Sequence, residues 1–372
     1  MSSPPTNRSE LRHARHRRRQ RLIGAAVAGI VVLAAGVGVA VLRSVLSGGD
    51  GDGDAARPAA PPPSITSAVP DATSTSGEPS TTTTAAGTAP IDVDRRYAVT
   101  TYDATYVDST RSTSPNGIFG GASNRTLATT FWYPAVSDGG APDRAHGPYP
   151  LVLFVHGYDQ TANFYAPMLE RWASAGYVVA GPTFPILSGI PGGASHVDYS
   201  KLFGDASFVI SQTLASSAET PIGGLVDGTR IAAAGHSDGE MVSFTLGFAI
   251  CCREGRIRAV IAMAGDLSNA AVDPMRDTGM PILHVIETND EYDPYQHSID
   301  WDRENLTAPR WMLTLLNASH VPPYNRPGNA HFELVSTATV DFLDGTLKGR
   351  ADRLDRLATD VAAHPDLATL ER

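Results

Sequence analysis

Apolar residues are distributed unevenly along the chain. The first apolar run, Leu22–Leu42, contains 21 residues and no charge, and a long polar stretch follows it. From about residue 92 onward, short apolar runs alternate with amphipathic ones, and no aromatic residue occurs before Tyr97. Because aromatic side chains contribute much of the buried area of a core, this pattern places the folded domain in the last three quarters of the chain.

The pattern beyond residue 92 predicts alternating strands and helices. Pro150–Val155 is apolar at every position, as in a strand buried on both faces, and the helical pattern of Asn163–Ala175 ends at Gly176. This alternation predicts an α/β fold with a mostly parallel central sheet and helices on both faces. The other expected strands are Tyr97–Tyr106, Thr126–Ala135, Tyr177–Ala180, Arg230–Ala234, Arg258–Met263, Pro281–Ile286 and, as the last strand, Arg310–Leu316. The other expected helices are Ala206–Ser217, Gly239–Ile250, Tyr295–Asn305, Val335–Leu347 and Ala351–Ala363.

The N-terminal region predicts a membrane anchor. Seven arginines and a single acidic residue, Glu10, occupy the first 21 residues. A helix over the 21 residues from 22 to 42 would rise about 30 Å, the thickness of a bilayer core. Arginines before the run place the N-terminus in the cytoplasm. We therefore expect a basic head (1–21) and a single-pass transmembrane anchor (22–42). A cleaved signal peptide is the alternative, although its apolar region would be shorter and followed by a cleavage site.

Residues 43–91 form an expected linker between the anchor and a catalytic domain at 92–372. The linker is rich in Ser, Thr, Pro and Gly, a composition that buries too little apolar surface to fold. The chain has 29 basic and 39 acidic residues, of which the head takes seven and one, so the remainder carries a net charge of −16. An acidic domain of this kind is not expected to bind nucleic acid.

The strongest chemical signal is Gly235-His236-Ser237-Asp238-Gly239. It follows an apolar strand and opens a helix, so the serine would stand on a sharp strand-to-helix turn. Glycines on either side allow the backbone to make that turn. The context predicts that Ser237 is a nucleophile.

A nucleophilic serine needs a base, and the base needs an orienting carboxylate. In folds of this kind the acid precedes the histidine along the chain, and each follows a strand. The strand expected at Pro281–Ile286 leads into a loop that offers Asp290, Glu291 and Asp293. We favour Asp290 because it is closest to the end of the strand.

The base is expected at His320, because a predicted strand leads directly to it. His331 is the alternative base, but no strand leads directly into that position. His156 and His236 flank turns and are expected to have structural roles.

Several motifs together resemble one family. They are Phe154-Val-His-Gly-Tyr158, the Ser237 motif, Asp290 with Pro294, and Asn317-Ala-Ser-His320; the helix Val340–Asp344 adds to the likeness. From about Arg96 to Arg350 the chain resembles the α/β-hydrolases, in particular their capless branch. This branch includes chlorophyllase-like, dienelactone-hydrolase-like and polyester- or cutin-cleaving (cutinase) enzymes of actinobacterial type.

The resemblance implies a role for each matching residue. Ser237 would be the nucleophile, His320 the general base and then the acid, and Asp290 the residue that orients His320. The backbone N–H groups of Tyr158 and Asp238 would form the oxyanion hole. Asp238 departs from the polyester-cleaving relatives, which carry methionine there, and this makes a purely apolar cleft less expected.

The chain leaves no room for a cap domain, because only a short segment separates the strands expected at Arg258–Met263 and Pro281–Ile286. The Gly- and Ser-rich stretch Ile186–Lys201 is expected to be a loop near the mouth of an open site. The only cysteines, Cys251 and Cys252, are adjacent and are predicted to form a disulfide in an oxidising compartment.

The expected activity is hydrolysis of carboxylic esters by a tethered, extracellular serine esterase of lipase-like type. No metal or cofactor is expected, because the chain has none of the usual metal-binding or dinucleotide-binding spacings. The expected partners are an ester substrate, which could be a small molecule, a lipid or a polymer, and the membrane. An acyltransferase with the same triad is one alternative. A catalytically silent binding domain is the other, although the presence of all three triad residue types argues against it.

Overall fold

The computed structural model of the protein describes residues 95–372, apart from 267–277, 294 and 308. The expected basic head (1–21), transmembrane anchor (22–42) and linker (43–91) lie outside these residues and stay predictions. Within the described part of the chain, no helix has both the length and the apolar character needed to cross a bilayer.

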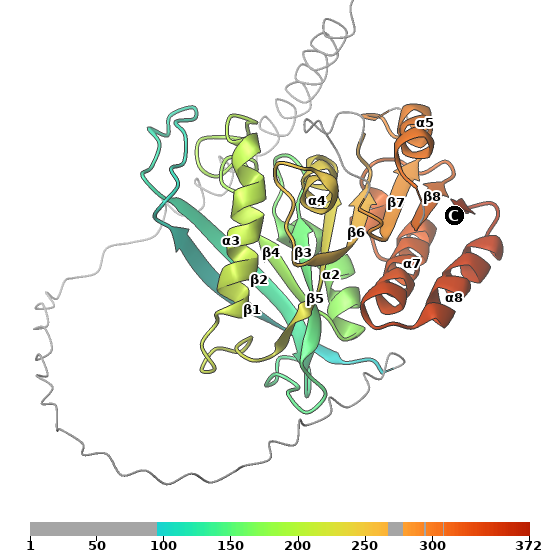
Figure 1. The fold of residues 1–372 in the computed structure, drawn as a ribbon, viewed down its shortest axis with the longest axis horizontal. Coiled ribbons are helices and arrows are strands. Elements are labelled where there is room, and N and C mark those ends of the chain that lie inside the picture. Colours follow the sequence, from blue (N-terminus) through green and yellow to red (C-terminus); the bar gives the residue numbers. More distant parts are fainter. Residues whose placement is uncertain (1–94, 267–277, 294, 308) are drawn as a thin grey trace, which may run out of the picture. The chain divides into compact units, whose positions relative to one another are not determined.

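The centre of the described domain is a nine-stranded sheet in the order β1-β2-β4-β3-β5-β6-β7-β8-β9 (Figure 1). Neighbouring strands from β4 to β8 pair in parallel, whereas β1 with β2, β2 with β4, and β8 with β9 pair antiparallel. The predicted mostly parallel sheet is thus confirmed. Its strands are β1 (Ala98–Asp108), β2 (Arg125–Ala135), β3 (Tyr149–Val155), β4 (Val178–Pro182), β5 (Val226–His236), β6 (Ile257–Met263), β7 (Ile282–Glu287), β8 (Arg310–Leu315) and β9 (Ala368–Glu371).

The expectation that the strand beginning at Arg310 is the last one is wrong. β9 pairs antiparallel with β8, from Leu315 opposite Ala368 to Met312 opposite Glu371. This strand has four residues, and two of them, Thr369 and Glu371, are polar. It therefore lacks the apolar run by which a buried strand is found in a sequence, as is common for a short strand at a sheet edge.

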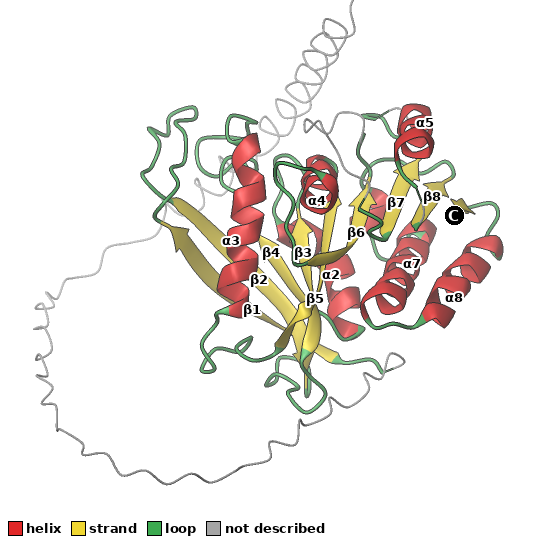
Figure 2. Cartoon of the chain, viewed as in Figure 1, coloured by secondary structure: helices red, strands yellow, loops and turns green. Residues whose placement is uncertain are grey.

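Helices cover both faces of the sheet, as predicted (Figures 1 and 2). α3 (Leu202–Leu214) and α4 (Asp238–Phe248) pack on one face, and α2 (Ala166–Ser174) and α7 (Ala330–Leu347) pack on the other. One apolar core therefore lies on each side of the sheet. The remaining helical segments are η1 (Ala162–Tyr165), η2 (Tyr199–Lys201), α5 (Tyr295–Asn305), α6 (Pro322–Asn325) and α8 (Ala351–Ala362).

Several helix ends differ from the expected positions. α7 begins at Ala330 rather than Val335, because the side chain of Asn329 accepts hydrogen bonds from the N–H groups of His331 and Phe332. α3 lies four residues earlier than expected at its start, at Leu202 instead of Ala206. Gly176 follows α2 with a φ of +91°, a conformation that suits glycine at a helix end.

The two adjacent cysteines form the predicted disulfide. Cys251 and Cys252 are bonded to each other in the turn that follows α4. α4 ends at Phe248, two residues before the expected Ile250. The disulfide therefore lies at the end of α4 that is opposite Ser237.

The loops after β5, β7 and β8 carry the candidate residues, and these strands end at the same edge of the sheet. Residues 264–281 join β6 to β7 and are too few to form a helical cap domain. The stretch Ile186–Lys201 is a loop apart from the short η2 turn, as predicted.

A buried group of charges anchors the end of that loop. The guanidinium of Arg125, at the start of β2, is fully buried and contacts two carboxylates. Its Nε lies 2.7 Å from Asp205 Oδ1, and its Nη1 lies 2.6 Å from Asp198 Oδ2. Burial opposes ionisation of Asp198, but the hydrogen bonds from Lys201, Ser114 and Arg125 outweigh it and lower the pKa of Asp198 to about 2.

We expect Arg125→Met to lower the free energy of unfolding by about 3–5 kcal/mol, because it leaves two buried carboxylates without their cation. Urea denaturation followed by circular dichroism at pH 7 measures this loss. The loss should shrink in acid, where the carboxylates that remain can be protonated.

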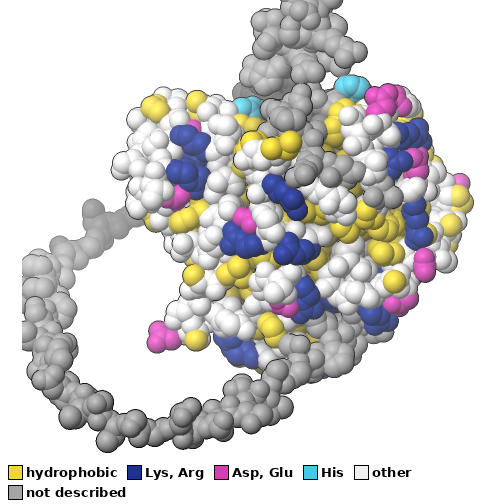
Figure 3. Space-filling view, in the orientation of Figure 1, with side chains coloured by type: hydrophobic (Ala, Val, Ile, Leu, Met, Phe, Trp, Pro, Cys, Tyr) yellow, Lys and Arg dark blue, Asp and Glu magenta, His cyan; other side chains and the backbone are white. Residues whose placement is uncertain are grey.

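Arg303 provides the matched control. Its guanidinium is half exposed and lies 2.6 Å from Glu371. Surface charges of both signs are common in this domain, and Figure 3 shows basic and acidic side chains interspersed over one face. Exposed ion pairs contribute little to stability, so Arg303→Met should have little effect. Equal losses in the two variants would contradict the anchoring role of Arg125.

Candidate active site

Ser237 lies in a tight turn between β5 and α4. Its backbone has φ 58° and ψ −124°, a conformation that is rare for residues other than glycine and that occurs at functional sites. A Cβ atom on Gly235 would lie 1.9 Å from the carbonyl oxygen of Gly239, and one on Gly239 would lie 2.1 Å from that of Val155. Both glycines of the motif are therefore required by the packing of α4 on β5 and β3.

The predicted oxyanion turn lies directly against the serine. A Cβ atom on Gly157 would lie 3.2 Å from the Cβ of Ser237, so the turn from His156 to Tyr158 borders the nucleophile. The N–H of Ser237 donates to the carbonyl oxygen of Met263 at 2.9 Å. Ser237 is 8% exposed, which keeps its hydroxyl near the surface but mostly shielded from water.

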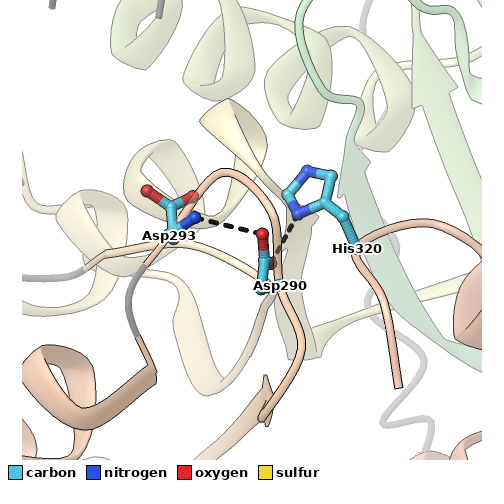
Figure 4. Close-up of side chains that lie close together, drawn as sticks. All are labelled: Asp290, Asp293 and His320. Atoms are coloured by element: carbon cyan, nitrogen blue, oxygen red, sulfur yellow. Dashed lines mark hydrogen bonds and ion pairs between the residues drawn. The ribbon is translucent and has the colours of Figure 1, made fainter. Parts of the chain in front are cut away.

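Asp290 is the carboxylate that contacts the predicted base. Its Oδ2 lies 2.6 Å from Nδ1 of His320 (Figure 4). Its other oxygen, Oδ1, accepts hydrogen bonds from the N–H groups of Tyr292 and Asp293, at 2.7 and 3.0 Å. The loop therefore holds Asp290 in place and directs it toward the ring.

The alternative residues take other positions. Glu291 accepts a hydrogen bond from the backbone N–H of His320 at 3.4 Å, and no contact joins its carboxylate to the ring. The Nε2 of His331 lies 2.9 Å from the carbonyl oxygen of Leu316. Among these candidates, a side-chain hydrogen bond joins Asp290 to His320.

Among the described residues, no hydrogen bond joins the Ser237 hydroxyl to His320, but His236 links their surroundings. The Nε2 of His236 donates to the carbonyl oxygen of His320 at 2.9 Å, and the two rings are 4.7 Å apart. Its Nδ1 accepts from the hydroxyl of Tyr165 at 2.8 Å. Burial, with the neighbouring His320, holds the pKa of His236 well below its ordinary value, so this ring is neutral and has the structural role predicted for it.

His156 is also structural, as predicted. Its Nε2 accepts from the N–H of Phe184 at 3.0 Å, so its Nδ1 carries the hydrogen and donates to the carbonyl oxygen of Gly157 at 2.8 Å. Burial lowers the pKa of His156 to about 4. The neutral ring therefore fixes the turn that precedes Tyr158.

Comparisons with known proteins show what the chain is similar to. The sequence model of the family described as chlorophyllase matches residues 140–279, a stretch that includes Gly157 and Ser237 and ends before Asp290 and His320. Chlorophyllase-1 of Arabidopsis thaliana is 26% identical over 219 residues, or 55% of this chain. The chain covers 62% of the length of that relative.

A solved structure, a ferulic acid esterase from Streptomyces cinnamoneus, has the same fold. It aligns with a TM-score of 0.58 and 20% identity, over 76% of this chain and 98% of its own. The chain has the α/β-hydrolase fold, and part of its sequence is similar to the chlorophyllase family. Its capless sheet, with the candidate residues after β5, β7 and β8, is the arrangement that the sequence resemblance predicts.

Two residues beside the site of this α/β-hydrolase were missed by the sequence analysis. Tyr165 accepts a hydrogen bond from the N–H of Gly157 at 3.4 Å and donates to His236. His196, in the loop Ile186–Lys201, pairs with Asp238 at 2.5 Å. Neither residue belongs to a local motif, and only the folded chain brings them to the serine.

One group in the described part of the α/β-hydrolase has the spacing of metal ligands. An oxygen of Asp290, an oxygen of Asp293 and a ring nitrogen of His320 lie within 4.8 Å of one another. In this group, however, Asp290 already bonds His320 and two backbone N–H groups, so its oxygens have partners. The group is therefore better explained as part of the candidate catalytic site than as a metal site.

A buried charge cluster lies under the nucleophile turn of the α/β-hydrolase. Nε2 of His284, on β7, lies 3.3 Å from Oε1 of Glu240, on α4, and its Nδ1 lies 3.7 Å from Oδ2 of Asp302, on α5. All three side chains are at most 1% exposed. Burial disfavours the charged ring, but the two carboxylates outweigh it and raise the pKa of His284 to about 10.

We expect this cluster to make stability depend on pH. The folded-state pKa of His284, about 10, lies above its ordinary value of 6.5. Its contribution is therefore complete below about pH 6.5 and is lost as the pH rises through about 10. His284→Gln should lower the free energy of unfolding by about 3–5 kcal/mol at pH 7, because two buried carboxylates lose their cation.

Urea denaturation at pH 7, 8.5 and 10 measures this effect. The loss in His284→Gln should be largest at pH 7 and smaller at pH 10. The exposed His364 serves as the control, and His364→Gln should follow the unmodified protein at each pH. A loss in His284→Gln that does not change between pH 7 and pH 10 would show that the ring is not charged in the folded protein.

Proposed function

We propose that the protein hydrolyses carboxylic esters through a serine mechanism, with Ser237 as nucleophile, His320 as base and Asp290 as its orienting acid. The observation that carries the proposal is the pairing of Asp290 with Nδ1 of His320. The pairing occurs on loops beside the strained turn that holds Ser237. The likeness to a chlorophyllase and to the fold of a ferulic acid esterase supports the ester class.

The proposed reaction has two steps. In the first, Nε2 of His320 takes the proton of the Ser237 hydroxyl as its oxygen attacks the ester carbonyl, and the same proton then passes to the leaving alcohol. In the second, His320 activates water, which attacks the acyl-enzyme and releases the acid and Ser237. Asp290, bonded to Nδ1, holds the ring with Nε2 available and stabilises its positive charge.

Among the described residues the Ser237 hydroxyl and the His320 ring are not hydrogen-bonded, and catalytic hydrogen bonds often form only when substrate binds. The carbonyl of His320 is held by His236 at 2.9 Å.

The backbone N–H groups of Tyr158 and Asp238 are proposed to bind the oxyanion. Gly157 packs against Ser237, which brings the N–H of Tyr158 close to the attacked carbon. α4 begins at Asp238, and the start of a helix favours negative charge. Removal of one such donor typically lowers kcat about 10²–10³-fold.

We expect the full chain to hydrolyse p-nitrophenyl esters in a series from acetate to palmitate. Ser237→Ala should lower kcat/KM at least about 10⁴-fold, because the nucleophile is lost. The same variant should lose labelling by a fluorophosphonate. Ser211→Ala, on the exposed side of α3, is the control and should keep full activity. If the unmodified protein shows neither hydrolysis nor labelling, the esterase proposal fails.

The same assay separates the two aspartates of the acid loop. Asp290→Asn should lower kcat about 10⁴-fold, because the amide cannot stabilise the positive ring of His320. Asp293→Asn should lower kcat less than about tenfold, since Asp290 is the carboxylate bonded to Nδ1 of His320. A reversed order would assign the acid role to Asp293.

We further propose that residues 22–42 anchor the chain in the membrane and leave the catalytic domain outside the cell. The support is the run of 21 uncharged residues preceded by seven arginines. The intact mass of the mature protein tests this, and we expect the mass of the whole chain. A mature protein without its first ~45 residues would instead indicate a cleaved signal peptide.

A further inference from the structure

We propose that His196 is a positioning residue for the oxyanion hole. Its ring contacts both Asp238 and Tyr158, the two residues whose backbone N–H groups would bind the oxyanion. The inference rests on the proposed function, because it assigns His196 to the same reaction. It reaches the site from the loop Ile186–Lys201, far from either motif in the sequence.

The contact with Asp238 is short and partly buried. Nε2 of His196 lies 2.5 Å from Oδ2 of Asp238, whose side chain is 2% exposed, whereas the ring of His196 is 31% exposed. A second residue of the same loop, Tyr199, donates its hydroxyl to the carbonyl oxygen of Asp238 at 2.8 Å. The loop thus holds Asp238 by both its side chain and its backbone.

The contact with Tyr158 is a stack. The rings of Tyr158 and His196 are 4.8 Å apart, with 27° between their planes. The hydroxyl of Tyr158 donates to the carbonyl oxygen of Ala194 at 2.7 Å. The loop therefore joins the two halves of the proposed oxyanion hole, which are Tyr158 in the turn after β3 and Asp238 at the start of α4. The loop residues that make these contacts are Ala194, His196 and Tyr199.

The loop is itself fixed at its far side, so it can act as a rigid support. The carboxylate of Asp198 contacts the buried guanidinium of Arg125 at 2.6 Å and accepts from the N–H of Ser114 at 3.0 Å. The side-chain amide of Asn116 donates to the carbonyl oxygen of Gly193 at 2.6 Å. These contacts tie the segment on both sides of His196 to the start of the domain.

Two physical effects follow from this arrangement. Oxyanion donors act only when they lie about 2.7–3.1 Å from the developing charge, and small displacements cost much of the rate. In addition, Asp238 is the residue next to Ser237. The negative charge of its carboxylate would oppose the oxyanion. A hydrogen bond from His196 Nε2–H offsets that charge and keeps it turned toward the loop.

The test compares variants of the full chain in hydrolysis of p-nitrophenyl butyrate and in binding of a trifluoromethyl ketone with the same acyl chain. The ketone forms a tetrahedral adduct with the serine and so reports oxyanion stabilisation directly. We expect His196→Ala to lower kcat about 10–10²-fold with KM changed less than about threefold. The inhibition constant of the ketone should rise by the same factor as kcat/KM falls.

Further variants separate positioning from general stability. In His196→Gln the side-chain amide can still donate to Asp238, so part of the rate should return. His196→Ala combined with Asp238→Ala should cost less than the two separate losses together, because both remove one interaction. Tyr199→Phe removes one hydrogen bond to Asp238 and should lower kcat about 3–10-fold. Tyr199→Phe carries the test if His196→Ala does not fold.

His146→Ala is the matched control. His146 is also a partly exposed histidine paired with a buried aspartate, with Nδ1 2.9 Å from Oδ1 of Asp143, but it precedes β3, at the opposite end from the site. It should keep both kcat and ketone affinity. If folded His196→Ala, or Tyr199→Phe where His196→Ala does not fold, keeps kcat and ketone affinity within twofold while Ser237→Ala is inactive, the role of His196 is refuted and the esterase proposal stands. If the unmodified protein neither hydrolyses the ester nor binds the ketone, both are refuted.

Discussion

The approach of the α4 backbone to β3 is the constraint on which the rest of the site depends. A Cβ atom at Gly239 would lie 2.1 Å from the carbonyl oxygen of Val155, so no other residue fits there. This contact sets the height of Ser237 above the sheet, and it also fixes its distance from Gly157, which follows β3. The nucleophile and the turn that would hold its oxyanion are therefore placed by a single backbone contact, before any catalytic side chain is considered.

A chain of neutral hydrogen bonds extends this constraint to the base. Gly157 donates to Tyr165, Tyr165 to His236, and His236 to the carbonyl oxygen of His320. Burial keeps the ring of His236 neutral by lowering its pKa, so it can accept from one side and donate on the other. Three loops that follow different strands are thereby held in register without a buried charge, and a charge there would compete with the positive form of His320 during catalysis.

The sequence predicted the elements and motifs whose signals are local, and failed where the signal comes from tertiary contacts. Ser237 could be found because its turn demands glycines nearby, and the strands because burial on both faces demands apolar runs. The acid was harder to predict, because Asp290, Glu291 and Asp293 all follow β7. Hydrogen bonds within the loop decide which carboxylate faces His320, and a sequence does not show them. His196 carried no local signal, because its contacts come from residues far away in the chain.

The buried charges around α4 help to position this helix in a way that apolar packing alone does not. Replacement of a buried ion cluster by packed apolar side chains often leaves stability unchanged or improves it, so stability alone does not explain Glu240, His284 and Asp302. These residues connect α4, β7 and α5. An apolar contact tolerates small shifts of a helix along a strand, whereas the attraction between charges 3.3 and 3.7 Å apart weakens as they separate. The cluster thus fixes α4, which bears Ser237, against β7, which leads to Asp290. On the outer side, His196 and Tyr199 hold the first residue of the same helix, so α4 is located by polar contacts both beneath and above the serine.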